Sequence, residues 1–150
     1  MVIMGIDPGY AIVGYGVIEA RAGRFLPLEH GAVTTEAGEN FSRRLEIIYE
    51  DVTTVLQKWR PGALSLEKLY FTNNKTTAIG VAEARGVILL AAQQNRVPVF
   101  EYTPLQVKQA VTGYGPAGKR PGMEMTREPR RLQEEAKPAA TDDAIAIVLM

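Results

Sequence analysis

The sequence predicts an α/β fold in which helices flank a mixed five-stranded sheet. Three strand-like segments at the N-terminus follow one another through short turns, a pattern typical of antiparallel strands. A helix then separates them from a fourth strand, and a second helix separates the fourth from a fifth. Such strand-helix-strand crossovers place strands parallel. With 150 residues, 46% of them hydrophobic, we expect one domain over residues 1–150.

The first three strands are expected over residues 2–6, 10–19 and 25–35. The first is apolar at every position, which is typical of a central strand covered on both faces. It ends at Asp7, directly before a Pro8-Gly9 turn. The third is expected to be broken or bulged near Pro27, because proline cannot donate a ladder hydrogen bond.

A helix opening at Ser42 and stopped by Pro61 is predicted from apolar residues at helical spacing. A short apolar strand over residues 62–67 then ends at Glu67. An Ala/Gly-rich helix (76–94) and a fifth strand (97–102) follow. The apolar residues at helical spacing in the first of these helices are Leu45, Ile48, Tyr49, Val52, Val55, Leu56 and Trp59.

The remaining third of the chain is less regular. Thr103-Pro104 fits the start of a helix reaching about residue 112, and residues 113–118 form a Gly-rich loop. Proline and glycine interrupt the segment 116–140. Thr141 can then cap a last helix, whose first turn holds Asp142 and Asp143.

Composition limits the class of protein. The chain has no cysteine, so it forms neither disulfides nor thiolate metal sites, and an intracellular location is expected. No leader peptide and no apolar run of membrane-spanning length is found. We therefore expect a soluble, cytoplasmic protein with no membrane contact.

The charges are unevenly placed, although the formal net charge is zero. Basic residues predominate between residues 104 and 131, where only Glu124 and Glu128 are acidic. Such a segment can follow the phosphates of a nucleic acid, and the alternative is an ordinary solvated surface. The basic residues are Lys108, Lys119, Arg120, Arg127, Arg130 and Arg131.

Three carboxylates can converge in this order of elements. If the first and fourth strands are neighbours, Asp7 and Glu67 end side by side, and the last helix can present Asp143 to them. Converging carboxylates need cations, and oxygen-only ligands suit Mg²⁺ or Mn²⁺. Two such ions about 4 Å apart are the usual device for phosphodiester cleavage. The alternative is that Asp7 only opens the Asp-Pro-Gly turn.

Several motifs, taken in order, resemble the RuvC family of crossover junction endodeoxyribonucleases, or Holliday junction resolvases. The resemblance is continuous over residues 1–115 and implies an RNase H-like fold. The motifs are Gly5-Ile6-Asp7-Pro8-Gly9, Gly14-Tyr15-Gly16, Glu67-Lys68-Leu69-Tyr70-Phe71, Ala84-Arg85-Gly86, Tyr102-Thr103-Pro104-Leu105-Gln106-Val107-Lys108-Gln109-Ala110 and Gly113-Tyr114-Gly115.

The resemblance also implies roles for individual residues. Asp7, Glu67 and Asp143 correspond to metal-binding carboxylates, with two Mg²⁺ ions, or Mn²⁺ in their place, at each site. Basic positions associated with junction DNA match Lys108 and Lys119, and we expect Arg120 to contact phosphate beside them. An aromatic that stacks near the junction centre matches Tyr70; the alternative is that Tyr70 or Phe71 fills the core. The implied partners are four-way junction DNA, a second copy of the chain and a branch-migration motor complex.

The C-terminal third departs from the family pattern. Family members carry an Asp or a His three residues before the final Asp, and here that position is Ala140. Asp142 adjoins Asp143 but points about 100° away on a helix, so it replaces the missing ligand only if the backbone shifts. Two hypotheses remain open: a nuclease with a rearranged third ligand, or an impaired protein that binds junctions without cutting them.

Two further signals have competing interpretations. The segment from Asp7 to Gly16 also resembles the first phosphate loop of actin-like and sugar-kinase ATPases, but this chain is too short for their second lobe and adenosine pocket. His30 is the only histidine, and we expect a strand surface residue rather than a metal ligand.

A symmetric homodimer is expected, since two equivalent strands of a junction must be nicked. The Ala/Gly-rich helix is its predicted interface, where small residues such as Gly80 and Ala84 would allow close approach of two helices. Ile79, Val87 and Leu90 would supply apolar contact. The alternative is that the whole helix packs on its own sheet.

Overall fold

The computed structural model describes residues 1–22, 24–69 and 75–103. In these ranges five strands form one sheet in the order β3-β2-β1-β4-β5. β1 (Val2–Asp7), β2 (Ile12–Arg21) and β3 (Arg24–Thr34) are successively antiparallel. β4 (Ala63–Glu67) is parallel to β1, and β5 (Val99–Tyr102) is parallel to β4. The predicted mixed sheet, with three antiparallel and two parallel strands, is confirmed.

β1 is the central strand. It is hydrogen-bonded to β2 on one side and to β4 on the other, and Met4, Gly5 and Ile6 are buried. Because a strand in this position is covered on both faces, it tolerates no polar residue along its middle. This explains why β1 is apolar at successive rather than alternate positions.

The hairpin of β2 and β3 contains one register shift. Val17 pairs with Glu29, whereas Ile18 pairs with Pro27, so Leu28 is the additional residue of β3. β3 is an edge strand, where a residue without a backbone N–H is tolerated. The irregularity expected near Pro27 is therefore a β-bulge.

Helix α1 (Phe41–Trp59) begins one residue earlier than predicted. Its N-cap is Asn40, whose side-chain oxygen accepts a 2.9 Å hydrogen bond from the backbone N–H of Ser42. At the other end, Arg60 has a left-handed backbone conformation, and its N–H donates to the carbonyl of Leu56 at 2.8 Å. Pro61 follows directly, so the predicted end of the helix is confirmed.

Helix α2 (Lys75–Gln94) corrects the expected dimer interface. Gly80 and Ala84 are buried within the subunit rather than exposed for a second copy. A Cβ at Gly80 would lie 2.8 Å from Cδ1 of Tyr10, so the small residue is needed for packing inside the chain. Ile79 and Leu90 are instead 61% and 50% exposed. The small-residue face thus packs within its own chain, whereas the face with Ile79 and Leu90 does not, so the alternative that the whole helix packs on its own sheet holds for one face only.

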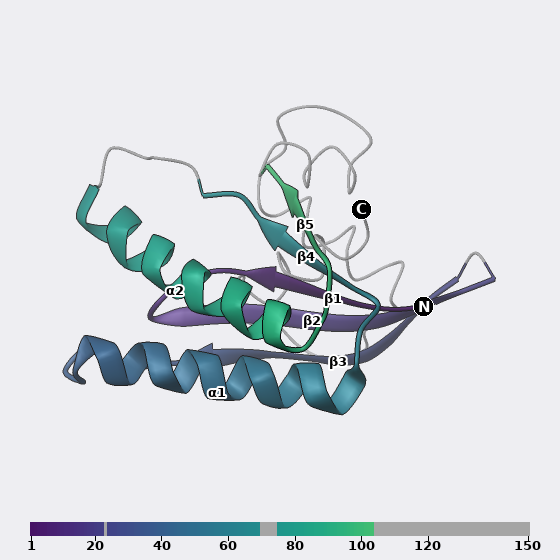
Figure 1. Cartoon of the computed structure of the whole chain (residues 1–150), viewed down its shortest axis with the longest axis horizontal. Helices are drawn as coiled ribbons and strands as arrows, with labels where there is room; N and C mark the ends of the chain where they lie inside the picture. The colour runs from purple at the N-terminus through teal and green to yellow at the C-terminus, as the bar shows by residue number, and fades with distance from the viewer. Residues whose placement is uncertain (23, 70–74, 104–150) are drawn as a thin grey trace, which may run out of the picture.

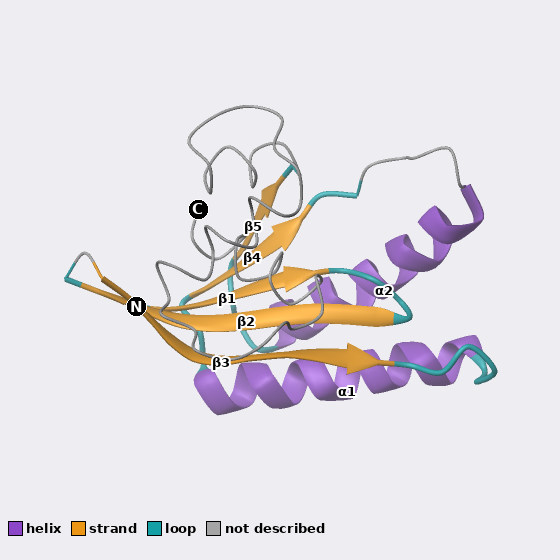
Figure 2. Ribbon diagram, turned by 180° about the vertical axis from the view of Figure 1, so that it is seen from behind, coloured by secondary structure: helices purple, strands orange, loops and turns teal. Residues whose placement is uncertain are grey.

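Both helices lie on the same face of the sheet, as views from opposite sides show (Figures 1 and 2). The hydrophobic core lies between this face and the helices. No helix among the described residues is long and apolar enough to cross a membrane. The strands contribute Met4, Ile6, Val13, Val17, Val33, Leu64 and Leu66 to the core, and the helices contribute Ile48, Val52, Val55, Leu56, Ala84, Ile88, Ala91 and Ala92.

Candidate functional site

Asp7 and Glu67 are the last residues of two neighbouring parallel strands. The register of β1 and β4 pairs Ile6 with Leu66, so the next residue of each strand brings the two carboxylates side by side. Figure 1 shows that the two strands end at the same edge of the sheet. The predicted proximity of Asp7 and Glu67 is therefore a property of the described fold.

The two carboxylates project from the face of the sheet that α1 and α2 leave uncovered. Ile6 and Leu66 are fully buried in the core on the helical face. Because successive residues of a strand point to opposite faces, Asp7 and Glu67 lie on the other face. Both residues are half-buried. A half-buried pair of acids at the end of two core strands is typical of a cation site.

Two neighbours of this pair follow from the strand register. Gly14 of β2 lies opposite Asp7, and Tyr102 of β5 lies opposite Glu67. Gly14 adds no side chain beside Asp7, whereas Tyr102 places an aromatic residue beside Glu67 on the same face. Tyr102 is not among the site residues predicted from the sequence. The sequence signal that could have identified Tyr102 is its position as the last residue of the fifth strand, which runs parallel to β4.

The turn that follows Asp7 is closely packed. A Cβ at Gly9 would lie 2.2 Å from the carbonyl oxygen of Ile12, so only glycine fits there. The hydroxyl of Thr35 donates to the backbone carbonyl of Tyr10, and the N–H of Thr35 donates to that of Ala11 at 2.9 Å. The segment after β1 is thus tied to the chain that follows β3.

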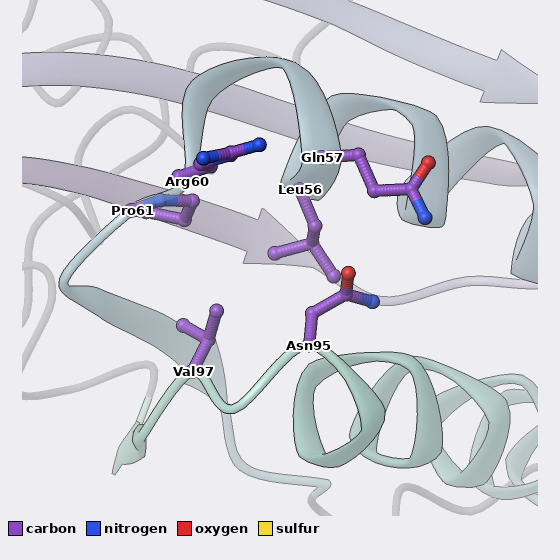
Figure 3. Close-up of a pocket in the computed structure, with 6 residues that line it drawn as sticks. All are labelled: Leu56, Gln57, Arg60, Pro61, Asn95 and Val97. Atoms are coloured by element: carbon purple, nitrogen blue, oxygen red, sulfur yellow. The ribbon is translucent and has the colours of Figure 1, made fainter.

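A cavity of about 510 Å³ lies at the opposite end of the sheet (Figure 3). It is formed where α1 and α2 end, and the side chains of Leu56 and Asn95 extend toward one another across it. Among the described residues that line it there is no carboxylate, and β4 begins rather than ends nearby. It is therefore separate from the Asp7 and Glu67 pair. The lining residues are Leu56, Gln57, Arg60, Pro61, Asn95 and Val97.

The other predicted site residues lie outside the described part of the chain. Within residues 1–22, 24–69 and 75–103, no group of three or more His, Cys, Asp or Glu residues could hold a metal ion. His30 accordingly belongs to no such group; it is a half-buried residue of β3. Asp7 and Glu67 carry oxygen donors of the kind that Mg²⁺ prefers. The residues outside the described ranges are Tyr70, Lys108, Lys119, Arg120, Ala140, Asp142 and Asp143.

Comparison with known proteins gives a consistent assignment. The family model for crossover junction endodeoxyribonuclease RuvC matches residues 3–150. The protein of that name from Brevibacillus brevis is 50% identical over 149 residues, covering 99% of this chain and 90% of the relative. The corresponding protein from Clostridioides difficile is 47% identical over 149 residues, covering 99% of this chain and 88% of the relative.

Solved structures agree with this assignment. The Thermus thermophilus RuvC structure in complex with a Holliday junction substrate has a TM-score of 0.93 and 37% identity, covering 99% of this chain and 91% of that one. The yeast mitochondrial Holliday junction resolvase Ydc2 shares the fold alone, with a TM-score of 0.68 and 11% identity, covering 98% of this chain and 77% of that one. Between the nuclease and ATPase interpretations, the family match decides for the nuclease. The chain belongs to the RuvC family and is a crossover junction endodeoxyribonuclease with an RNase H-like resolvase fold.

Proposed function

We propose that the chain resolves four-way DNA junctions by hydrolysing two symmetrically placed phosphodiesters, leaving 5′-phosphate and 3′-hydroxyl ends. Asp7, Glu67 and Asp143 act as the carboxylate ligands of two Mg²⁺ ions, for which Mn²⁺ can substitute, within a single nuclease domain formed by residues 1–150. The observation that carries this proposal is the parallel pairing of β1 and β4, which brings two carboxylates together on the face of the sheet opposite α1 and α2.

The donor chemistry fits a hard divalent cation. Asp7 and Glu67 contribute oxygen ligands only, and a nearby pair of carboxylates is stabilised by positive charge between them. When bound, such ions supply an activated water and stabilise the leaving oxygen. The protein positions its two described ligands through rigid strands rather than loops, which favours a precise site.

The identity of the third ligand is an open question for this chain, because Ala140 occupies the position where family members carry an Asp or a His. Asp143 supplies it in the main hypothesis, and Asp142 supplies it if the local backbone is shifted. If neither does, the protein binds junctions without cutting them. Asp142→Asn and Asp143→Asn separate these cases, because only the variant that removes the ligand abolishes cleavage.

Junction binding is assigned to the basic segment and to one aromatic. Lys108, Lys119 and Arg120 contact phosphates, and Tyr70 stacks near the centre of the junction. The Thermus thermophilus relative was solved with a Holliday junction substrate, which supports the same ligand here. Alanine at each basic position is expected to lower the salt dependence of binding by a slope of about one. A cytoplasmic location is proposed because bacterial DNA lies in the cytoplasm. Association with a branch-migration motor complex is also proposed.

The active form is proposed to be a symmetric homodimer, because one site per chain can nick only one of two equivalent strands. The described interface candidate is the exposed face of α2, where Ile79, Glu83, Gly86 and Leu90 recur at helical spacing. Gly86 has nothing within 4 Å of an added Cβ, so it leaves room for a second helix. This face replaces the Gly80 and Ala84 face predicted from the sequence.

The nuclease activity is tested with a synthetic four-way junction and Mg²⁺ or Mn²⁺. Wild type should produce paired nicks, whereas Asp7→Asn and Glu67→Gln should lose cleavage by about a thousandfold or more and still bind the junction. Glu46→Gln is the matched control, since Glu46 is an exposed carboxylate on α1. Cleavage by wild type no better than by Asp7→Asn would disprove the nuclease assignment of this site.

The dimer is tested by light scattering on the purified chain. Leu90→Glu should give a monomeric mass at micromolar concentration and single rather than paired nicks, because it places a charge in an apolar interface. Thr54→Glu on the exposed side of α1 is the control and should remain dimeric. A monomeric wild type, or a dimer unaffected by Leu90→Glu, would contradict the interface.

A further inference from the structure

A buried arginine lies beside the turn that carries Asp7. Arg44 on α1 is only 6% exposed, and its described partners are neutral. Its Nε donates a 2.9 Å hydrogen bond to the hydroxyl of Thr35, and its guanidinium carbon lies 4.8 Å from the centre of the Tyr10 ring. Burying a guanidinium costs free energy that a hydrogen bond and a ring contact offset only in part. Such a group needs a reason beyond packing.

The partners of Arg44 hold the backbone that follows Asp7. The hydroxyl of Thr35 accepts from Arg44 and donates its single proton to the carbonyl of Tyr10. The backbone N–H of Thr35 donates to the carbonyl of Ala11 at 2.9 Å. Arg44 therefore fixes the direction in which the Thr35 hydroxyl points. Two hydrogen bonds from Thr35 then hold residues 10 and 11.

The Tyr10 side chain is held on three sides. Arg44 lies over its ring, and Phe41 of α1 meets the ring edge-on, with centroids 5.8 Å apart and planes at 66°. Gly80 of α2 leaves room for the same ring, since a Cβ there would lie 2.8 Å from it. Both helices thus contact the residue three positions after Asp7.

We propose that Arg44 is a positioning residue for the metal-binding carboxylate of Asp7, acting through Thr35 and Tyr10. Only Pro8 and Gly9 separate Asp7 from Tyr10; proline restricts the backbone and Gly9 is tightly packed against Ile12. A displacement of Tyr10 is therefore transmitted to the end of β1. The inference rests on the proposed role of Asp7 as a metal ligand.

The first test measures Mn²⁺ binding to the protein without DNA, by electron paramagnetic resonance of the free ion. Arg44→Met should weaken binding about tenfold or more, the usual effect of removing a residue that orients a metal ligand. Thr35→Val should weaken it similarly, whereas Thr35→Ser keeps the hydroxyl and should bind like wild type. Arg43→Met is the matched control, because Arg43 is the exposed neighbour of Arg44.

The second test separates positioning from general stability. Hydrogen–deuterium exchange of the metal-free protein should become faster over residues 8–12 in Arg44→Met than in wild type. Val55→Ala destabilises the far end of α1 by creating a cavity, and it should leave both Mn²⁺ affinity and exchange in this turn unchanged when the protein is fully folded. The double variant Arg44→Met/Thr35→Val should bind Mn²⁺ about as well as either single variant, since both act through one path.

The outcomes distinguish this inference from the proposed function. If Asp7→Asn weakens Mn²⁺ binding but Arg44→Met has no more effect than Val55→Ala, the positioning role is wrong and the nuclease site stands. If Asp7→Asn leaves Mn²⁺ binding unchanged and wild type does not cut junctions, the proposed function itself is wrong. Weakened binding in Arg44→Met and Thr35→Val, with Thr35→Ser unaffected, supports the inference.

Discussion

The hydroxyl of Tyr15 on β2 donates a 3.0 Å hydrogen bond to Oε1 of Glu29 on β3. Oε2 of the same carboxylate accepts a 2.8 Å hydrogen bond from Nε1 of Trp59 and another from Lys58, both near the end of α1. One acid therefore joins two strands to the helix that packs on them. Glu29 and its three donors lie on the helical face of the sheet, away from Asp7.

Glu29→Gln is expected to lower the free energy of unfolding by about 1–3 kcal/mol at neutral pH, because the amide cannot replace the charged hydrogen bonds to Lys58 and Trp59. Urea denaturation monitored by circular dichroism measures the difference. Glu46→Gln is the control, since Glu46 forms only an exposed pair with Arg43 and should change stability little. Equal effects of the two substitutions would contradict the structural role of Glu29.

Acid should remove the contribution of Glu29. Burial raises the pKa of this carboxyl, but the hydrogen bonds from Lys58, Trp59 and Tyr15 together lower it by more. The pKa therefore lies below its ordinary 4.5. The unfolded chain then binds more protons than the folded chain, and the stabilisation present above pH 4.5 is lost as pH falls through the folded pKa. The stability gap between wild type and Glu29→Gln should therefore narrow below pH 4.5. A gap that widens in acid would be the opposite result.

Tyr15 should act at the alkaline end. Burial, followed by the hydrogen bond to Glu29 and the charges of Glu29 and Asp51, raises the pKa of its phenol from 10.0 to about 12. The folded chain then holds a proton that the unfolded chain loses, so stability present below pH 10 falls between pH 10 and 12. Absorbance at 295 nm should show one phenol fewer titrating near pH 12 in Tyr15→Phe. If the phenol that is missing in Tyr15→Phe is one that titrates near pH 10 in wild type, the raised pKa of Tyr15 would be contradicted.

Gly80→Ala should destabilise the fold by about 1–3 kcal/mol, because its Cβ would lie 2.8 Å from Cδ1 of Tyr10. The same substitution in a Tyr10→Ala background should cost little, since the obstructing ring is gone. Gly38→Ala is the control: nothing lies within 4 Å of its added Cβ. Denaturant midpoints of wild type, the two single variants and the double variant complete the cycle, and additive effects of Gly80→Ala and Tyr10→Ala would rule out the contact.

Arg60→Gly should raise the free energy of unfolding by about 1 kcal/mol. Arg60 ends α1 with a φ of 44°, a left-handed conformation that glycine adopts without strain. Gln57→Gly is the matched substitution within the helix, where it should cost about 1 kcal/mol instead. Thermal and urea midpoints measure both changes. A loss of stability in Arg60→Gly would show that its side chain matters more than its backbone.

The strands, helices and strand directions could be predicted from the sequence because each depends on local pattern, whereas the proximity of Asp7 and Glu67 was predicted only on the condition that the first and fourth strands are neighbours. Continuous apolar residues identify buried strands, and a helix between two of them favours a parallel crossover. The turn residues and the helix end at Pro61 depend likewise on a few adjacent positions.

Features that depend on distant contacts could not be predicted. The direction in which the small residues of α2 face is decided by Tyr10, which lies far away in the sequence and occupies the space above Gly80. The same holds for the partners of Arg44, which come from the chain after β1 and after β3. Asn40, rather than Ser42, caps α1 because several polar residues compete for that end, and only the final backbone conformation selects one.

The parallel pairing of β1 with β4 has a consequence for how the protein is made. β1, β2 and β3 pair through short connections, but Glu67 reaches Asp7 only after the chain has closed a long loop through α1. Long-range pairing of this kind is slow, because loop entropy is lost before any contact forms. During synthesis, one edge of β1 remains unpaired until β4 arrives, so an incomplete chain carries Asp7 without its partner carboxylate. Asp7 and Glu67 therefore come together only after the chain has been synthesised past α1 and β4 has paired with β1.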